Sequence, residues 1–141
     1  MRHMKLFGIA ALAALTTFAL GYLWGARGRW AALEQLATAQ RQLNLSEARR
    51  HALTGQVLLG KLNFGEAAGQ FDAARAAAET ARAYFDGAGL VAPAQEAAAA
   101  VQSLEIARGL AAKVDQAAVG KAGEAVAALD RASAAVPPPP Q

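Results

Sequence analysis

One run of regular spacing limits what this chain can fold into more than any other feature of its sequence. From residue 62 to residue 85, phenylalanine and alanine recur at alternating intervals of three and four, at Phe64, Ala67, Phe71, Ala74, Ala78, Ala81 and Phe85. That spacing places all seven side chains on one face of an α-helix. The side chains of the stripe are large at both ends and small in the middle, so we expect a second helix to lie closely along its alanines.

The composition extends this expectation to the rest of the chain. Alanine has the highest helix propensity and little apolar surface to bury, and it is the commonest residue among the 141. We therefore predict an all-α fold with closely packed helices and room for one small domain. The chain has no cysteine, which excludes disulfides and thiolate metal sites, and its net charge of +3 is too small for a nucleic-acid-binding face.

An uncharged segment, residues 6–26, precedes the patterned part of the chain. Twenty helical residues rise about 30 Å, which matches the hydrocarbon core of a bilayer. Cations flank the segment on both sides and aromatic residues gather at its far end: Arg2, Lys5, Arg27, Arg29, Tyr22, Trp24 and Trp30. These features predict a single transmembrane helix in contact with lipid.

The positive N-terminus, residues 1–5, favours a cytoplasmic start, with the remainder in the periplasm of a bacterial inner membrane. Gly21 and Gly25 form a small-residue pair that would let another membrane helix approach closely. A cleavable signal peptide, with its apolar core at residues 6–15, remains the alternative interpretation.

Behind the anchor we expect a juxtamembrane helix over residues 27–45, then a helical hairpin domain over residues 46–136. Four residues of the first helix follow heptad spacing: Leu33, Leu36, Gln40 and Leu43. The three leucines would cover one side of the bundle. A break at 44–46 would let Ser46 cap the next helix. That helix shares an apolar face made of Ala48, Ala52, Gly55, Leu59 and Leu62.

Later breaks are predicted from glycine and proline, giving about four to five helices after the anchor. The patterned helix should stop where Gly87 or Gly89 can adopt a left-handed conformation. Pro93 suits the first turn of the next helix, which should run to about residue 118 with Val101, Leu104, Ala107, Ala111 and Val114 on its apolar side. Gly120 should interrupt before a last helix, and the proline-rich tail, residues 137–141, cannot be helical.

The hairpin resembles a tetratricopeptide repeat over residues 48–81. The small, aromatic and alanine positions of that family's signature are matched by Gly55, Phe64, Ala67, Phe71 and Ala74, and Leu58 replaces the usual aromatic of the first helix. The chain departs from the signature at Glu79, where proline is usual, and at His51. A weaker internal similarity aligns residues 64–74 with residues 122–132. The offset between the two segments does not fit a regular tandem array. The resemblance implies helical hairpins that bind protein partners.

The sequence offers few residues that could carry out catalysis. Of the two histidines, His3 precedes the anchor and His51 lies within a helix beside arginines. The carboxylates of residues 66–86 alternate with arginines as solvated pairs, and neither metal-ligand spacing nor a phosphate loop occurs. We expect no enzyme activity, no cofactor and no metal.

These features together predict a non-enzymatic, membrane-anchored interaction protein, an accessory or assembly subunit of a larger membrane complex such as a respiratory or photosynthetic one. Partner-facing residues would be Arg49, Gln56 and Lys61, on the concave side of the hairpin. Two alternatives stay open. One is a soluble periplasmic ligand binder or chaperone released from a cleaved signal. The other is a homodimer held by Gly21, Gly25 and the leucines at 33, 36 and 43.

Overall fold

The computed structural model describes residues 32, 33 and 35–136. Internal contacts divide the chain after Ala37, and the few described residues of the first unit are helical. The predicted terminal segments and membrane helix, Gly21 and Gly25 included, and the proline tail lie outside the described residues. Within the part of the chain that is described, no helix combines the length and the apolar character needed to cross a membrane.

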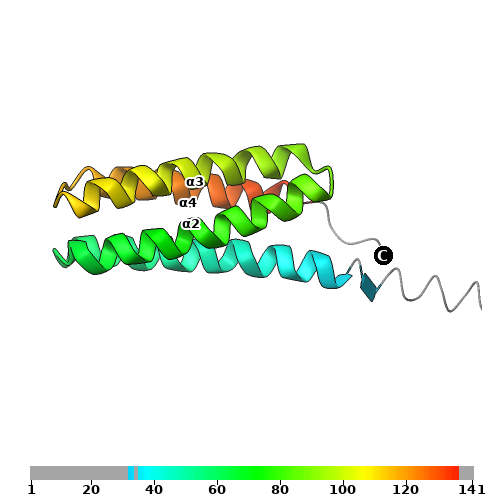
Figure 1. Cartoon of the computed structure of the whole chain (residues 1–141), viewed down its shortest axis with the longest axis horizontal. Helices are drawn as coiled ribbons and strands as arrows, with labels where there is room; N and C mark the ends of the chain where they lie inside the picture. Colours follow the sequence, from blue (N-terminus) through cyan, green and yellow to red (C-terminus); the bar gives the residue numbers. More distant parts are fainter. Residues whose placement is uncertain (1–31, 34, 137–141) are drawn as a thin grey trace, which may run out of the picture. The chain divides into compact units, whose positions relative to one another are not determined.

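The described part of the second unit is an all-α bundle, which confirms the predicted class. The helix over residues 35–60 belongs to this unit from residue 38 onward, and it is followed by α2 (Phe64–Gly87), α3 (Val91–Ala112) and α4 (Ala118–Ala134). Figure 1 shows these helices side by side, each running opposite to the one before it. The turns after residue 60 and after α3 therefore lie at one end of the bundle, and the turn after α2 lies at the other.

The core consists mostly of alanine. Its largest fully buried side chains are Phe71, Phe85, Leu104 and Leu129, and nearly all the rest are alanines from the inner faces of the helices. The stripe of α2 points into this core: six of its seven side chains are buried, and Phe64 is half-buried at the helix start. Because alanine methyl groups are small, the helix backbones can approach closely.

Gly55 and Phe71 approach each other closely. A Cβ atom placed on Gly55 would collide with the ring of Phe71, standing 2.9 Å from both Cδ1 and Cζ. Leu58 and Phe64 are half-buried and pack against the same core, whereas Ala67 and Ala74 are fully buried. The ring of Phe71 therefore occupies the space that the missing side chain of Gly55 leaves.

The break predicted at 44–46 is wrong, because one helix runs without interruption from residue 35 to residue 60. Ser46 does not cap a new helix: its Oγ donates a hydrogen bond of 2.8 Å to the Leu43 carbonyl, a bond that serine commonly makes inside helices. The prediction that Leu43 covers the bundle is also wrong. Its exposed fraction is 57%, because Leu45 and Ala48 supply the inner face instead. Leu33 and Leu36, predicted to cover the same side, belong to the first unit and are exposed at 61% and 57%.

Two predicted helix faces extended too far. Leu62 and Val114 were placed on apolar faces, yet both lie in turns and are 66% exposed. The helix predicted to run to residue 118 ends at Ala112, and Gly120 lies inside α4 rather than before it. Gly89, in contrast, adopts the predicted left-handed conformation after α2, with a φ of 69°.

Candidate functional site

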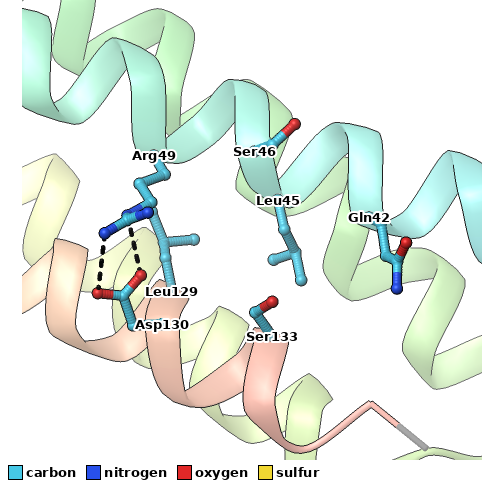
Figure 2. A pocket seen from close by; sticks show the side chains of 7 residues that line it. All are labelled: Gln42, Leu45, Ser46, Arg49, Leu129, Asp130 and Ser133. Atoms are coloured by element: carbon cyan, nitrogen blue, oxygen red, sulfur yellow. Dashed lines mark hydrogen bonds and ion pairs between the residues drawn. The ribbon is translucent and has the colours of Figure 1, made fainter. Parts of the chain in front are cut away.

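A small groove lies between the 35–60 helix and α4 (Figure 2). The buried side chains of Leu45 and Leu129 line it, and Gln42, Ser46 and Ser133 contribute its polar side chains. An ion pair is part of its wall: Arg49 Nε lies 2.9 Å from Asp130 Oδ1, and a second contact of 3.5 Å joins Arg49 Nη2 to Oδ2. Both side chains are about half exposed.

This groove suits helix packing better than ligand binding. Its volume is about 120 Å³, well below the roughly 300–1,000 Å³ of small-molecule sites. Nucleophilic catalysis needs a base within hydrogen-bond reach of the hydroxyl, and no histidine lines the groove beside Ser46 or Ser133. The Arg49–Asp130 pair joins residues 81 positions apart and fastens the last helix to the first.

The three residues predicted to face a partner have different surroundings. Arg49 is paired with Asp130 of α4. Gln56 is half-buried, and its Nε2 lies 3.6 Å from the position that a Cβ on Gly123 of α4 would take. Lys61 is exposed in the turn after residue 60. The side of the hairpin that carries Arg49 and Gln56 is thus occupied by α4 of the same chain.

His51 joins the first helix to α2. Its Nδ1 lies 2.7 Å from Gln70 Oε1, and its Nε2 lies 3.0 Å from Arg50 Nη2. In the neutral ring that fits both contacts, Nδ1–H donates to Gln70 and Nε2 accepts from Arg50. Among the described residues, no three histidine or carboxylate side chains gather as a metal site would require.

The turn end of the bundle has the most unusual backbone in the described chain. Leu62 and Val114 both have a φ of 60°, a left-handed conformation that costs a side-chain-bearing residue about 1–2 kcal/mol. Each follows a helix end of the same type. Asn63 N donates to the Leu58 carbonyl and Asp115 N to the Leu110 carbonyl, at 2.9 and 3.0 Å. Glycine is the usual residue at this position, and the chain uses it at Gly89.

These two turns share more than their backbone. Each places an exposed lysine immediately before the strained aliphatic residue, Lys61 before Leu62 and Lys113 before Val114. Within the described chain, neither lysine belongs to an ion pair. We call this set of four residues the turn tip: Lys61, Leu62, Lys113 and Val114. The nearby carboxylates are engaged locally, since Asp115 Oδ1 accepts from Ala117 N and Glu66 Oε2 accepts from Asn63 Nδ2.

A charged cluster joins α2 to α3 on the outer surface. Arg75 lies 2.6 Å from Glu79 and 3.3 Å from both Asp72 and Glu105. The hydrogen bond to Asp72 and the charge of Glu79 raise the pKa of Arg75. The hydrogen bond from Arg108 lowers the pKa of Glu105, and the same bond raises the pKa of Arg108. These groups pair with one another, so the cluster serves packing rather than chemistry.

No protein family, curated protein or solved structure matches the chain. The resemblance to a tetratricopeptide repeat therefore rests on the residues of the hairpin alone. Repeats of that kind stack so that each contacts only its neighbours, whereas here α4 returns to the 35–60 helix through Arg49 and Asp130.

Sequence reasoning missed the turn tip. It predicted Lys61 as a partner-facing residue of the hairpin, and it assigned Leu62 and Val114 to the apolar faces of helices. The available signal was the repeated order of a lysine, an aliphatic residue and a side-chain amide or carboxylate, at residues 61–63 and 113–115. Turn prediction usually relies on glycine and proline, and neither occurs in these two tripeptides.

Proposed function

We propose that the chain is a non-enzymatic, membrane-anchored interaction protein, an accessory or assembly subunit of a larger bacterial inner-membrane complex. In this proposal residues 6–26 anchor the chain in lipid, with the N-terminus in the cytoplasm. The helical bundle lies in the periplasm and docks onto a protein partner. Respiratory and photosynthetic complexes are examples of such assemblies.

The observation that supports docking is the turn tip. Leu62 and Val114 are 66% exposed and adopt a backbone conformation that glycine would adopt without strain. Strained residues persist where the surrounding structure or a function requires them. The exposed aliphatic side chains of the tip suit a partner surface with apolar hollows. The adjacent lysines, which lack an ion-pair partner in the described chain, suit carboxylates on that surface.

The turn tip lies at one end of the bundle. The tip follows residue 60 at the far end of the helix that begins the described bundle. A helix rises about 1.5 Å per residue, so the tip lies roughly 35 Å along that helix from residue 38, where the unit begins.

The test is native mass spectrometry of the tagged full chain after gentle detergent extraction from its own membranes. We expect the natural chain to co-purify with a larger complex in fixed stoichiometry. The double variant Leu62→Gly and Val114→Gly should lose the partner although its backbone is less strained, so failure to fold cannot explain the loss. Val91→Ala is the matched control, because Val91 is equally exposed, at 66%, at the opposite end of the bundle.

Two results would contradict the proposal. If the double glycine variant retains the complex as the natural chain does, the turn tip is not the docking surface. If the natural chain is recovered alone, shortened at its N-terminus and soluble without detergent, the anchor is a cleaved signal. That second result would support the periplasmic binder or chaperone.

A further inference from the structure

The outer face of the 35–60 helix differs from the outer faces of the other helices. Side chains at alternating spacings of four and three form one stripe on it, turned away from the core: Ala39, Leu43, Ser46, Arg50, Leu53 and Val57. All six residues are exposed, and the three large apolar members have exposed fractions of 57%, 40% and 57% at Leu43, Leu53 and Val57. We call these six residues the outer stripe.

No ion pair within the described residues involves the outer stripe. The surfaces of α2, α3 and α4, in contrast, carry pairs such as Arg82–Asp86, Arg108–Glu105 and Lys121–Glu124. Buried Leu45, Ala48, Ala52 and Leu59 already give the 35–60 helix an inner apolar face. A helix needs one such face to join its own bundle. The heptad spacing of the second face is the spacing that a further helix requires.

We infer that this second face binds the same face of another copy of the chain, with the two 35–60 helices antiparallel about a two-fold axis beside Ala48. Two-fold contacts are reciprocal: if one residue meets another, the second meets the first in return. With the axis at this level, Leu43 meets Leu53 of the second copy. Ala39 then meets Val57 of the second copy, so every large apolar member of the outer stripe is covered.

The charges of the helix favour the antiparallel arrangement. Glu47 and Arg50 lie at the edge and in the middle of the outer stripe, and neither has an ion-pair partner within the described residues. In the antiparallel pair, Arg50 stands within about one residue rise, roughly 1.5 Å, of the level of Glu47 of the second copy. A parallel pair in register would instead place Arg50 of one copy against Arg50 of the other, because this residue lies in the middle of the stripe. Like charges opposed across an interface are unfavourable.

This inference goes beyond the proposed function, because it depends neither on the anchor nor on the turn tip. The outer stripe lies along the side of the bundle, so dimer formation leaves the turn end accessible. A failure of either proposal therefore does not imply a failure of the other.

The absence of cysteine from the chain permits a direct test by disulfide trapping. Leu43→Cys and Leu53→Cys are prepared as separate full-length variants in mild detergent, one with a size tag, and are oxidised alone and mixed. We expect a disulfide-linked dimer chiefly in the mixture, since antiparallel pairing brings residue 43 beside residue 53 of the second copy. Trapping that is equally efficient with Leu43→Cys alone would show parallel pairing and overturn the inference.

The control pairs Leu53→Cys with Ile106→Cys. Ile106 is as exposed as Leu53, at 41% against 40%, but lies on α3, away from the outer stripe. This mixture should form little disulfide-linked dimer. Trapping as efficient as in the 43 and 53 mixture would mean random collision and would overturn the inference, as would no trapping in either mixture.

A charge exchange provides a second measurement, by analytical ultracentrifugation of chains without cysteine. Glu47→Arg and Arg50→Glu should each weaken dimerisation by at least about tenfold, because each sets like charges together across the pair. The double variant should recover most of the natural affinity. Equal weakening in both single variants and in the double variant would contradict the proposed contact.

Discussion

The two hairpins of the bundle follow one plan with different side chains. The first hairpin is the 35–60 helix with α2, and the second is α3 with α4. Each turn has the same hydrogen bonds around a lysine and a left-handed aliphatic residue. Seven positions before that residue, the first hairpin has Gly55 and the second has Ala107, both buried. In the aligned segments of α2 and α4, Phe71 corresponds to Leu129.

The comparison leads us to expect that Gly55 and Phe71 tolerate change only as a pair. A phenylalanine ring fits the first hairpin because the facing residue is glycine, which leaves room for it. The second hairpin has a smaller leucine in α4 and an alanine at the position that corresponds to glycine. Close packing makes a change on one side unfavourable unless the other side also changes.

The largest expected effect comes from removing the ring that distinguishes the first hairpin. Phe71→Ala should lower the free energy of unfolding by about 3–5 kcal/mol, because the side chain is fully buried and leaves a cavity. Urea denaturation followed by circular dichroism measures the loss. Phe64→Ala is the control, and it should cost less because Phe64 is only half-buried. Equal losses would mean that the ring of Phe71 has no special place in the core.

Transferring the residues of the second hairpin into the first tests the pairing itself. Gly55→Ala should cost about 1–3 kcal/mol, since its Cβ would collide with the ring of Phe71. In the double variant Gly55→Ala, Phe71→Leu, the smaller leucine should remove the collision and reduce the penalty of the alanine. A double-mutant cycle measures the coupling, which should be at least about 0.5 kcal/mol. Strict additivity would contradict the idea that the two residues change together.

The turns offer a comparison in which glycine should stabilise the protein. Val114→Gly should raise the free energy of unfolding by about 1 kcal/mol, since it relieves a strained backbone and removes a largely exposed side chain. Leu62→Gly should gain somewhat less, because leucine is not β-branched. Gly89→Ala is the reverse control, and it should lower the free energy of unfolding by a similar amount. Thermal melts measure the change. If Val114→Gly destabilises the bundle, the valine side chain makes a contact that stabilises the fold by more than the backbone strain destabilises it.

The smallest expected effect concerns the cluster that links the two hairpins. The hydrogen bond from Arg108 lowers the pKa of Glu105, and the nearby Arg75 acts in the same direction. A carboxyl group of this kind stabilises the fold above its unfolded pKa, and the contribution disappears as the pH falls through the lowered folded value. Stability should therefore decrease slightly on acidification below about pH 4.3. Glu105→Gln should flatten this part of the pH profile, and an unchanged profile would contradict the assignment.

Local pattern was sufficient for the class of the fold and for the buried stripe of α2. The end of α2 was also predictable, because Gly89 is the kind of residue that left-handed helix ends prefer. The turns at Leu62 and Val114 were not, because aliphatic residues there look like continuations of a helix face. Ser46 was misread for a similar reason, since serine serves both as a cap and as an interior residue.

Contacts between distant segments account for the remaining errors. The ion pair of Arg49 with Asp130 joins the first helix to the last, and no local spacing indicates it. An isolated hairpin would leave Arg49 and Gln56 on an open surface, but α4 occupies that side. The outer stripe, in contrast, is visible in the spacing of residues 39–57 once the helix is known to be continuous.

The alanine core also affects how the protein responds to temperature. Unfolding a bundle that buries mainly methyl groups exposes little apolar surface for each residue released. The heat capacity increment of unfolding should therefore fall below the roughly 12–15 cal/mol/K per residue that is usual for globular proteins. A small increment flattens the curve of stability against temperature. The bundle would then keep a modest but nearly constant margin of stability in the cold as well as in the heat.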